Sequence, residues 1–260
     1  MTPAAECFAD FLAAARRAGR QIDEQLAPKT VPVDAATAYD VADAVAARLG
    51  WEPLGWKIAG TSEDVRRRLG ISGPIRGRTF RRFALSSPAR LPHSELLDPL
   101  VECEFFVTLA KDLPFRLEPF AMGDIRAAID HVAAGIEVAE CRFPMRALPP
   151  LPAILADGSA SGRYVFGDAI EDWQNGLASM EVVLEVDGAL RRRGAGTDVM
   201  GDPLRPILWL TEALRRRGLG LAAGEMISTG SCTGMLPIRT GQRVRAVFGG
   251  KAQVEITFDE

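Results

Sequence analysis

Residues 100–109 read LVECEFFVTL, an apolar run rich in β-branched and aromatic residues that nevertheless holds two carboxylates. Asp98-Pro99 comes before the run and Pro114 follows it closely, so the pattern predicts a buried β-strand. Side chains alternate faces along a strand, and Glu102 and Glu104 therefore point the same way. Two like charges on one face of a buried strand repel each other and resist burial, and a divalent cation between them would relieve both effects. An edge strand with a solvated face would also explain the pattern.

A second short apolar run, GIEVAEC at residues 135–141, carries a further acid, Glu137. Together with Glu102 and Glu104 it makes three carboxylates on two predicted strands, and neither strand contains a histidine. Carboxylate oxygens are the ligands that hard cations prefer. The pattern therefore favours a site for Mg²⁺ or Mn²⁺ over the edge-strand interpretation.

The overall composition is that of an ordinary globular protein, with 260 residues, 47% of them hydrophobic and 25% charged. A net charge of −3 gives no field that would attract nucleic acid or an anionic membrane. No apolar run reaches the roughly 18 residues that a membrane span needs, and no continuous apolar signal core is present. Four scattered cysteines lack metal-type or CxxC spacing, so we expect reduced thiols and a cytoplasmic protein.

The order of patterns along the chain predicts a helical N-terminal region over residues 1–52 and a single β-rich body over residues 53–260. Apolar positions recur at helical spacing over residues 4–25 and again over residues 34–49. A further helix is predicted over residues 122–134, leading into the strand of Glu137. Residues 71–99 have few periodic signals but many Gly, Pro, Ser and Arg residues, and are interpreted as loops and short strands.

Lys57 lies in the middle of a predicted apolar strand, between Trp56 and Ile58. A lysine held in apolar surroundings loses proton affinity and can exchange a proton near neutral pH. Lys57 is therefore a candidate catalytic residue. A lysine at a strand edge that reaches solvent is an equally simple interpretation.

Two polar loops of small residues could form other walls of the site. The segment TGSCTG begins at Thr229, directly after an apolar strand, and its glycines let the backbone approach a ligand. The hydroxyls and amides of Thr229, Gly230 and Ser231 can hold a carboxylate or an oxyanion. Ser159 and Ser161 belong to a second such loop, DGSASG. Either segment could also be a plain solvated turn.

Taken together, these residues resemble the fumarylacetoacetate hydrolase superfamily, and within it the 2-keto-4-pentenoate hydratase / 4-oxalocrotonate decarboxylase branch. The matching segments follow the order of the family from residue 55 to residue 237. They are Gly55-Trp56-Lys57-Ile58, Val101-Glu102-Cys103-Glu104, Ile136 to Arg142, Ala156 to Gly162, Gly201-Asp202-Pro203-Leu204, Thr229-Gly230-Ser231 and Met235-Leu236-Pro237.

The resemblance implies an α+β fold whose mostly β body is a partly closed β-roll like the C-terminal domain of the superfamily, with a helical N-terminal region. It also implies a homo-oligomer and a divalent metal, Mg²⁺ or Mn²⁺, held by Glu102, Glu104 and Glu137. Lys57 matches the lysine that the family places beside the substrate. The family substrate is a small 2-oxo acid or its dienol, whose carboxylate and 2-oxygen can chelate the metal together.

Two segments depart from the pattern of the family. The first is Asp157-Gly158-Ser159, where the family tends to have asparagine after the aspartate, and the second lies at residues 77–82. Hydratases of this branch carry acid in the loop after a Gly-x-Leu-like segment, where this chain reads GRTFRR over residues 77–82. We therefore place Arg78 among the candidate substrate-binding residues, because a guanidinium can grip a second carboxylate through two hydrogen bonds. An arginine loop that points to solvent is the alternative.

The function expected from the resemblance is a metal-dependent lyase that hydrates a 2-hydroxydienoic acid in aromatic compound catabolism, with Lys57 transferring a proton. Decarboxylation of a 4-oxalocrotonate-like 2-oxo diacid is the nearest alternative. Hydrolysis of an acylpyruvate would need a base that activates water, for which Glu140 and His131 are candidates. A non-catalytic subunit that keeps the scaffold to bind a catalytic partner is a fourth possibility.

Overall fold

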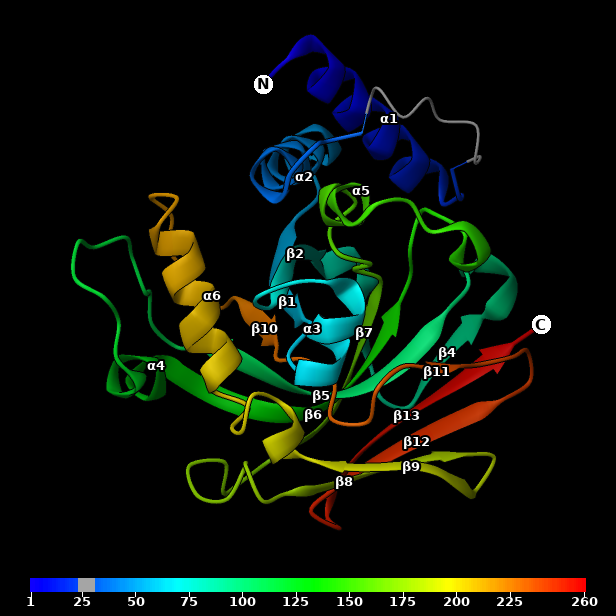
Figure 1. The fold of residues 1–260 in the computed structure, drawn as a ribbon. Coiled ribbons are helices and arrows are strands. Elements are labelled where there is room, and N and C mark those ends of the chain that lie inside the picture. The colour runs from blue at the N-terminus through cyan, green and yellow to red at the C-terminus, as the bar shows by residue number, and fades with distance from the viewer. Residues whose placement is uncertain (23–30) are drawn as a thin grey trace.

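The computed structural model describes residues 1–22 and 31–260, which form two β-sheets and a set of surrounding helices (Figure 1). In these residues the larger sheet has the strand order β2-β1-β10-β5-β6-β7-β3, with β11 beside β5, and the smaller sheet has the order β4-β13-β12-β8-β9. The strands are β1 (Pro53–Ala59), β2 (Ile75–Phe80), β3 (Ala84–Ser86), β4 (Ala89–Pro92), β5 (Leu100–Leu109), β6 (Ile129–Ala139), β7 (Arg163–Ala169), β8 (Glu181–Val186), β9 (Ala189–Ala195), β10 (Met226–Ser228), β11 (Leu236–Pro237), β12 (Arg243–Phe248) and β13 (Ala252–Asp259).

The helices lie around the larger sheet, which curves strongly so that the neighbouring strands β1 and β2 lie on one side of its hollow and β7 on the other (Figure 1). They are α1 (Pro3–Ala18), α2 (Ala35–Leu49), α3 (Glu63–Leu69), α4 (Met122–Ala128), α5 (Leu151–Ala156) and α6 (Arg205–Arg215). Both α1 and α2 stand at one end of the molecule and the smaller sheet at the other. The expected α+β fold with a partly closed roll and a helical N-terminal region is confirmed.

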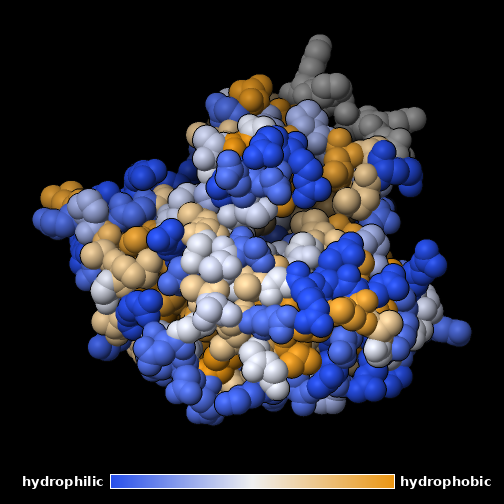
Figure 2. All heavy atoms as spheres, turned by 60° about the horizontal axis from the view of Figure 1, so that its bottom comes forward, coloured by the Kyte–Doolittle hydropathy of each residue, from blue (hydrophilic) through white to orange (hydrophobic). Residues whose placement is uncertain are grey.

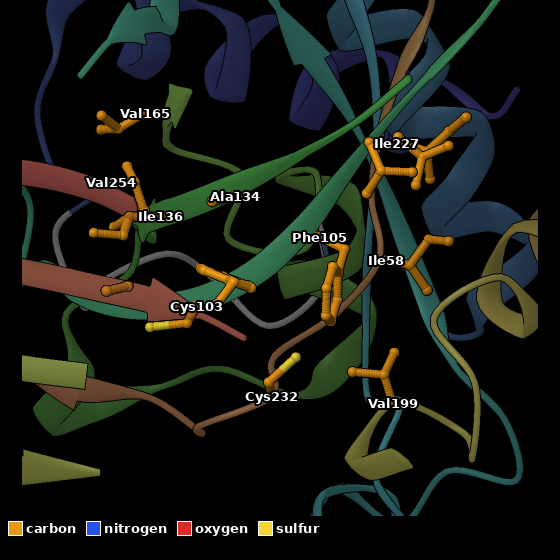
Figure 3. Close-up of a cluster of buried hydrophobic side chains, with 14 of the residues drawn as sticks. Ile58, Cys103, Phe105, Ala134, Ile136, Val165, Val199, Ile227, Cys232 and Val254 are labelled. Carbon is orange, nitrogen blue, oxygen red and sulfur yellow. The ribbon is translucent and has the colours of Figure 1, made fainter. Parts of the chain in front are cut away.

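The strand pair β5–β6 forms the centre of the fold. Alternate residues of β5, among them Cys103 and Phe105, point to the side of the smaller sheet, where Ile136 of β6 and Val254 of β13 join them (Figure 3). The ring of Phe105 meets Phe248 of β12 edge to face, with 5.2 Å between ring centroids. The intervening residues of β5 therefore face the inside of the roll.

The N-terminal helices begin and end where their sequence signals indicate. Thr2 caps α1 and Asp34 caps α2, and glycines in the left-handed conformation follow both helices. The helix predicted over residues 34–49 is confirmed, whereas the one predicted over residues 4–25 ends at Ala18, and residues 23–25 lie outside the described part of the chain. The division at residue 52 stays a prediction, since α1 and α2 share a core cluster with α5 and with side chains of β2.

The helix predicted over residues 122–134 was wrong in its second half. Only Met122–Ala128 is helical, and β6 begins at Ile129. Alanine favours a helix, but the pairing of this stretch with β5 places Val132 opposite Val107 and Ala134 opposite Phe105. Tertiary pairing thus decided the conformation. Residues 71–99 hold the short strands β2, β3 and β4, as expected.

Hydrophobic and hydrophilic atoms are intermixed over the face of the molecule drawn in Figure 2. Within residues 1–22 and 31–260, none of the helices combines the length and the apolar character that crossing a bilayer requires.

We predict that Phe105→Ala lowers the free energy of unfolding by about 3–5 kcal/mol, because the ring is fully buried between the two sheets and its loss leaves a cavity. Urea unfolding monitored by circular dichroism measures the change. Phe115 is the matched control, since its side chain is 49% exposed and Phe115→Ala should change the stability by less than about 0.5 kcal/mol. Equal effects of the two substitutions would contradict this account of the core.

Candidate functional site

Three carboxylates converge on the inner face of the roll. Glu102 of β5 lies directly opposite Glu137 of β6, and Glu104 is two residues further along β5 on the same face. The side chains are almost completely buried, and each offers an oxygen within 4.8 Å of the others. The structure thus brings together the three acids that strand alternation placed on one face.

Burial strongly opposes ionisation of this cluster. It raises the pKa of Glu104 well above its usual value, and the neighbouring carboxylates Glu137 and Glu102 raise it further. Burial also raises the pKa of Glu102, and it raises the pKa of Glu137 to about 7 against the opposing effect of Lys57. A cluster of this kind favours any cation that can enter it.

Lys57 supplies one positive charge to the cluster. Its ammonium is fully buried, lies 3.2 Å from Glu137 Oε1 and donates a hydrogen bond to the carbonyl oxygen of Ser159 at 2.9 Å. Burial lowers the pKa of Lys57, but Glu137, Glu102 and Glu104 together raise it above the ordinary value. This differs from the apolar environment expected from the sequence, because the acids that face β1 come from strands distant in the chain. Lys57 therefore carries a positive charge at neutral pH.

The end of β10 and the turn after it hold Glu104 in place. The backbone N–H of Gly230 donates to Glu104 Oε2 at 2.8 Å, and the hydroxyl of Ser228 donates to the same oxygen. Gly230 has a φ of 105°, and a Cβ there would lie 2.4 Å from the hydroxyl oxygen of Thr61. Glycine is thus required at this position, and its amide serves the carboxylate directly.

Tyr164 of β7 is a site residue that the sequence pattern did not reveal. It is the cross-strand partner of Glu137, and its hydroxyl donates to Glu137 Oε1 at 3.3 Å and shares a hydrogen bond of 2.8 Å with Ser161 Oγ. Burial raises the pKa of Tyr164 well above its usual value, so the phenol stays protonated. The alternation of β7 could have indicated its face, but the register against β6 was needed to place it beside Glu137.

In the described part of the chain, some of the buried polar atoms without a hydrogen-bond partner belong to the cluster or to residues near its partners. They include Glu137 Oε2, the hydroxyl of Thr229 next to Gly230, and the hydroxyl of Thr79. Thr79 is two residues from Gly77, the cross-strand partner of Lys57, and so lies on the same face of the sheet as that lysine. Such atoms are rare in protein interiors unless a polar ligand or an ion satisfies them. With an all-oxygen donor set, they fit a hard divalent cation and a polar ligand beside it.

The other predicted ligand-binding residues are placed as follows. Ser231 follows Gly230, and its hydroxyl lies close to Glu102. The hydroxyl lowers the pKa of that carboxyl, but burial has the larger effect and raises it. Ser159 accepts from Lys57 through its carbonyl oxygen, and its hydroxyl donates to the carbonyl oxygen of Arg76 at 2.7 Å. Ser161 meets Tyr164.

The structure does not bring Arg78 to the cluster. Arg78 pairs with Trp56 across β1 and β2, so its side chain is on the opposite face of the sheet from Lys57. Its guanidinium lies 3.8 Å from the centre of the Trp56 ring and forms an ion pair of 2.6 Å with Glu225. The arginine that departs from the family pattern is therefore held by residues outside the site.

The two candidate bases for water activation also lie away from the cluster. Glu140 accepts from the backbone N–H of Leu97 at 3.1 Å and lies 3.6 Å from Arg163. The exposed His131 contacts Asp130, its neighbour in sequence.

Comparison with known proteins places the chain in a family. Residues 66–258 match the family model described as Fumarylacetoacetate (FAA) hydrolase C-terminal. The chain belongs to this family. It is 30% identical over 233 residues to a 2-keto-4-pentenoate hydratase of Paraburkholderia phymatum, with 87% of each chain covered. It is 28% identical over 206 residues to a 4-oxalocrotonate decarboxylase of Pseudomonas putida, with 79% of this chain and 77% of the relative covered.

A solved structure of the same family superimposes over nearly the whole chain. The 4-oxalocrotonate decarboxylase from Pseudomonas putida G7, complexed with magnesium and adipate, matches with a TM-score of 0.88 and 26% identity and covers 98% of this chain and 97% of its own. The resemblance inferred from the sequence is thus confirmed, including its branch, since both enzyme types of that branch occur among the relatives.

We predict that the protein in the presence of a chelator loses stability as the pH rises from about 4.5 to about 7. The folded-state pKa of Glu137 is about 7 and its ordinary value is 4.5, so between these values the folded state binds more protons than the unfolded state. The contribution of Glu137 to the free energy of unfolding is therefore largest below pH 4.5 and is about 3 kcal/mol smaller at pH 7. Urea unfolding at a series of pH values measures the decline.

The variant Glu137→Gln isolates this effect, because it keeps the shape of the side chain and removes its titration. Its stability should fall less than that of the wild type over the same pH range. Glu181→Gln, at an exposed position, is the control and should follow the wild type. A pH dependence that is the same in wild type and Glu137→Gln would show that Glu137 titrates normally.

Proposed function

We propose that this protein is a divalent-metal-dependent lyase that acts on a 2-oxo or 2-hydroxydienoic acid, with hydration of the 2-keto-4-pentenoate hydratase type as its reaction. The observation that carries the proposal is the buried cluster of three carboxylates with the ammonium of Lys57 beside it. The identity of about 30% to a named hydratase over 87% of the chain supports the choice of reaction. We further propose a cytoplasmic homo-oligomer, and the free cysteines are in keeping with a reducing compartment.

We propose that Glu102, Glu104 and Glu137 hold the cation, which is Mg²⁺ or Mn²⁺. A cation bound there would act as a Lewis acid on the carboxylate and the 2-oxygen of the substrate. The unpartnered Glu137 Oε2 is the oxygen that remains free for it, since Oε1 of the same carboxylate serves Lys57 and Tyr164.

The protein residues around the cluster have separate tasks in the hydration. Lys57 is the proton donor for ketonisation of the dienol: a proton is placed on the far end of the diene, the 2-hydroxyl releases its own proton to solvent, and a conjugated enone is left. Addition of water to the enone then gives a 4-hydroxy-2-oxo acid. The carbonyl of Ser159 and the carboxylate of Glu137 orient the ammonium of Lys57, and the hydroxyl of Thr229 is free to bind the carboxylate of the substrate.

Decarboxylation of a 4-oxalocrotonate-like diacid is the second candidate reaction. It is favoured by the similarity to the decarboxylase structure at a TM-score of 0.88. A cation held by the same cluster would stabilise the dienolate that develops as carbon dioxide leaves. Hydrolysis of an acylpyruvate has less support, because Glu140 and His131 contact residues outside the cluster. A non-catalytic subunit is disfavoured by the complete set of buried acids and lysine.

The test is to incubate the purified protein and Mg²⁺ with 2-hydroxydienoates, 2-oxo diacids and acylpyruvates and to identify the products by mass spectrometry. Gain of water, loss of carbon dioxide and cleavage identify a hydratase, a decarboxylase and a hydrolase. No conversion of any compound, with a protein that binds the metal and is folded, would reject the proposal of an enzyme in this reaction class.

We predict that Glu102→Gln, Glu104→Gln and Glu137→Gln each weaken the binding of Mg²⁺ or Mn²⁺ by at least about tenfold, because each removes one anionic oxygen ligand while keeping the shape of the side chain. Isothermal titration calorimetry measures the affinity. Glu140→Gln is the matched control, since that carboxylate is also buried but contacts Leu97 and Arg163 instead. Unchanged affinity in all three cluster variants would remove the metal from this site.

We predict that Lys57→Met lowers turnover by about 10²–10⁴-fold, the usual effect of removing a positioned acid or base. The variant keeps the apolar stem of the side chain, so it should remain folded and should still bind the metal. Steady-state kinetics on the substrate found by the product analysis, together with metal titration, test this. Turnover close to that of the wild type would make Lys57 a structural residue.

A further inference from the structure

The loop between α5 and β7, residues 157–162, forms one wall around Lys57. The carbonyl oxygen of its Ser159 accepts the hydrogen bond from the ammonium of Lys57 at 2.9 Å, and the Ser159 hydroxyl donates to the carbonyl oxygen of Arg76 in β2 at 2.7 Å. The loop also lies directly on β2, because a Cβ added at Gly77 would be 2.0 Å from the carbonyl oxygen of Gly158. The position of the Ser159 carbonyl therefore depends on how this loop is held.

The backbone of the loop is in a conformation that its own residues do not favour. Gly158, Ser159 and Ala160 are consecutive and all lie in the left-handed region, with φ values of 78°, 57° and 60°. Serine and alanine are disfavoured there by contact between Cβ and the backbone. Residues in such conformations persist only where the surrounding structure holds them.

Arg16 of α1 is one of the groups that hold the loop, although it is distant in sequence. Its Nε donates to Asp157 Oδ1 at 2.9 Å, and its Nη2 donates to the carbonyl oxygen of Asp157. The second carboxylate oxygen of Asp157 accepts from the backbone N–H of Arg142 at 2.9 Å. Arg16 is 6% exposed and Asp157 is completely buried, so this ion pair is enclosed in the protein.

A continuous series of contacts thus leads from the first helix to the lysine of the site. Arg16 grips both the side chain and the backbone carbonyl of Asp157, and two residues later Ser159 accepts from Lys57. We propose that Arg16 is a positioning residue: by clamping Asp157 it fixes the loop 157–162, and through the Ser159 carbonyl it sets the orientation of the Lys57 ammonium. The kinetic consequence of this proposal rests on the function proposed above, but the structural consequence does not.

The ion pair between Arg16 and Asp157 does more than hold α1 in place. That helix has its own apolar face, in which Phe8 and Leu12 are almost completely buried in the second core cluster. A buried ion pair adds little net stability compared with apolar contacts, because both charges lose their hydration. What the guanidinium supplies is a fixed geometry, since its planar donors reach two oxygens of one residue at once.

The test uses Arg16→Gln, with Arg17→Gln as the matched control. Arg17 is the next residue of the same helix, but it is exposed and contacts the carbonyl oxygen of Arg48. Two readouts need no substrate: hydrogen exchange of peptides from residues 153–163, and acetylation of Lys57 by N-hydroxysuccinimidyl acetate. Mass spectrometry reads each lysine separately, because the only others in the sequence are Lys29, Lys111 and Lys251.

We expect Arg16→Gln to raise the exchange rate of the loop peptides and the labelling rate of Lys57 by about tenfold or more, with labelling of Lys111 and Lys251 unchanged. Arg17→Gln should behave as the wild type. Loop exchange and Lys57 labelling equal to those of the wild type would overturn the proposal. If peptides of α1 also exchange faster in Arg16→Gln, that helix has loosened, and the variant Asp157→Asn is used instead. It weakens the ion pair from the loop side and leaves the packing of α1 in place, and the same increase in loop exchange and in Lys57 labelling is expected.

The kinetic arm separates positioning from folding. With a substrate that the wild type converts, Arg16→Gln should lower kcat by about 10–100-fold, the effect of a small misplacement of a catalytic group, with KM and metal affinity unchanged. Arg16→Lys, which keeps the charge, should recover part of the loss. A lower metal affinity with unchanged kcat would overturn the proposal. If the wild type converts none of the compounds, the proposed function fails, and the loop exchange and Lys57 labelling alone decide whether Arg16 positions the lysine.

Discussion

Keeping three carboxylates out of water is the constraint on which the rest of this structure depends. Removing such groups from water costs several kcal/mol each unless partners replace the lost hydration. The roll supplies those partners from every side: the ammonium of Lys57, the amide of Gly230 and the hydroxyls of Ser228 and Tyr164. Three carboxylates and one ammonium leave a formal charge of minus two, which one divalent cation would balance.

The same strands that carry the acids also build the core. In β5, Cys103 and Phe105 face the smaller sheet, while Glu102 and Glu104 face the hollow of the roll. The apolar contacts between the sheets therefore fix the backbone from which the carboxylates project. Because a strand cannot rotate one residue without its neighbours, the packing of the core and the geometry of the site are set together.

Much of this site could be predicted because its signals are local. Alternation within one strand is enough to place Glu102 and Glu104 on one face, and a third acid in a second apolar run is visible in the sequence. What required the structure was the register between strands. It places Tyr164 beside Glu137, and it places Arg78 with Trp56 on the face away from Lys57.

Two other expectations from the sequence failed for the same reason, because contacts between different strands decided the outcome. The charge around Lys57 comes from strands far away in the chain, so a local view gave the wrong environment and the wrong direction for its pKa. The start of β6 at Ile129 was hidden because the alanines of this segment favour a helix, whereas pairing with β5 imposes a strand.

The strand of Lys57 has a consequence for the order in which the molecule is assembled. In the larger sheet β1 lies between β2 and β10, and its residue Gly55 pairs with Met226, about 170 residues later in the chain. The acids of β5 and β6, by contrast, belong to antiparallel neighbours that are close in sequence. Contacts between distant segments form slowly because a long loop must close first. During synthesis on the ribosome the pair β5–β6 can therefore form early, whereas β1 and Glu104 gain their contacts with β10 and the turn after it only once that segment has emerged.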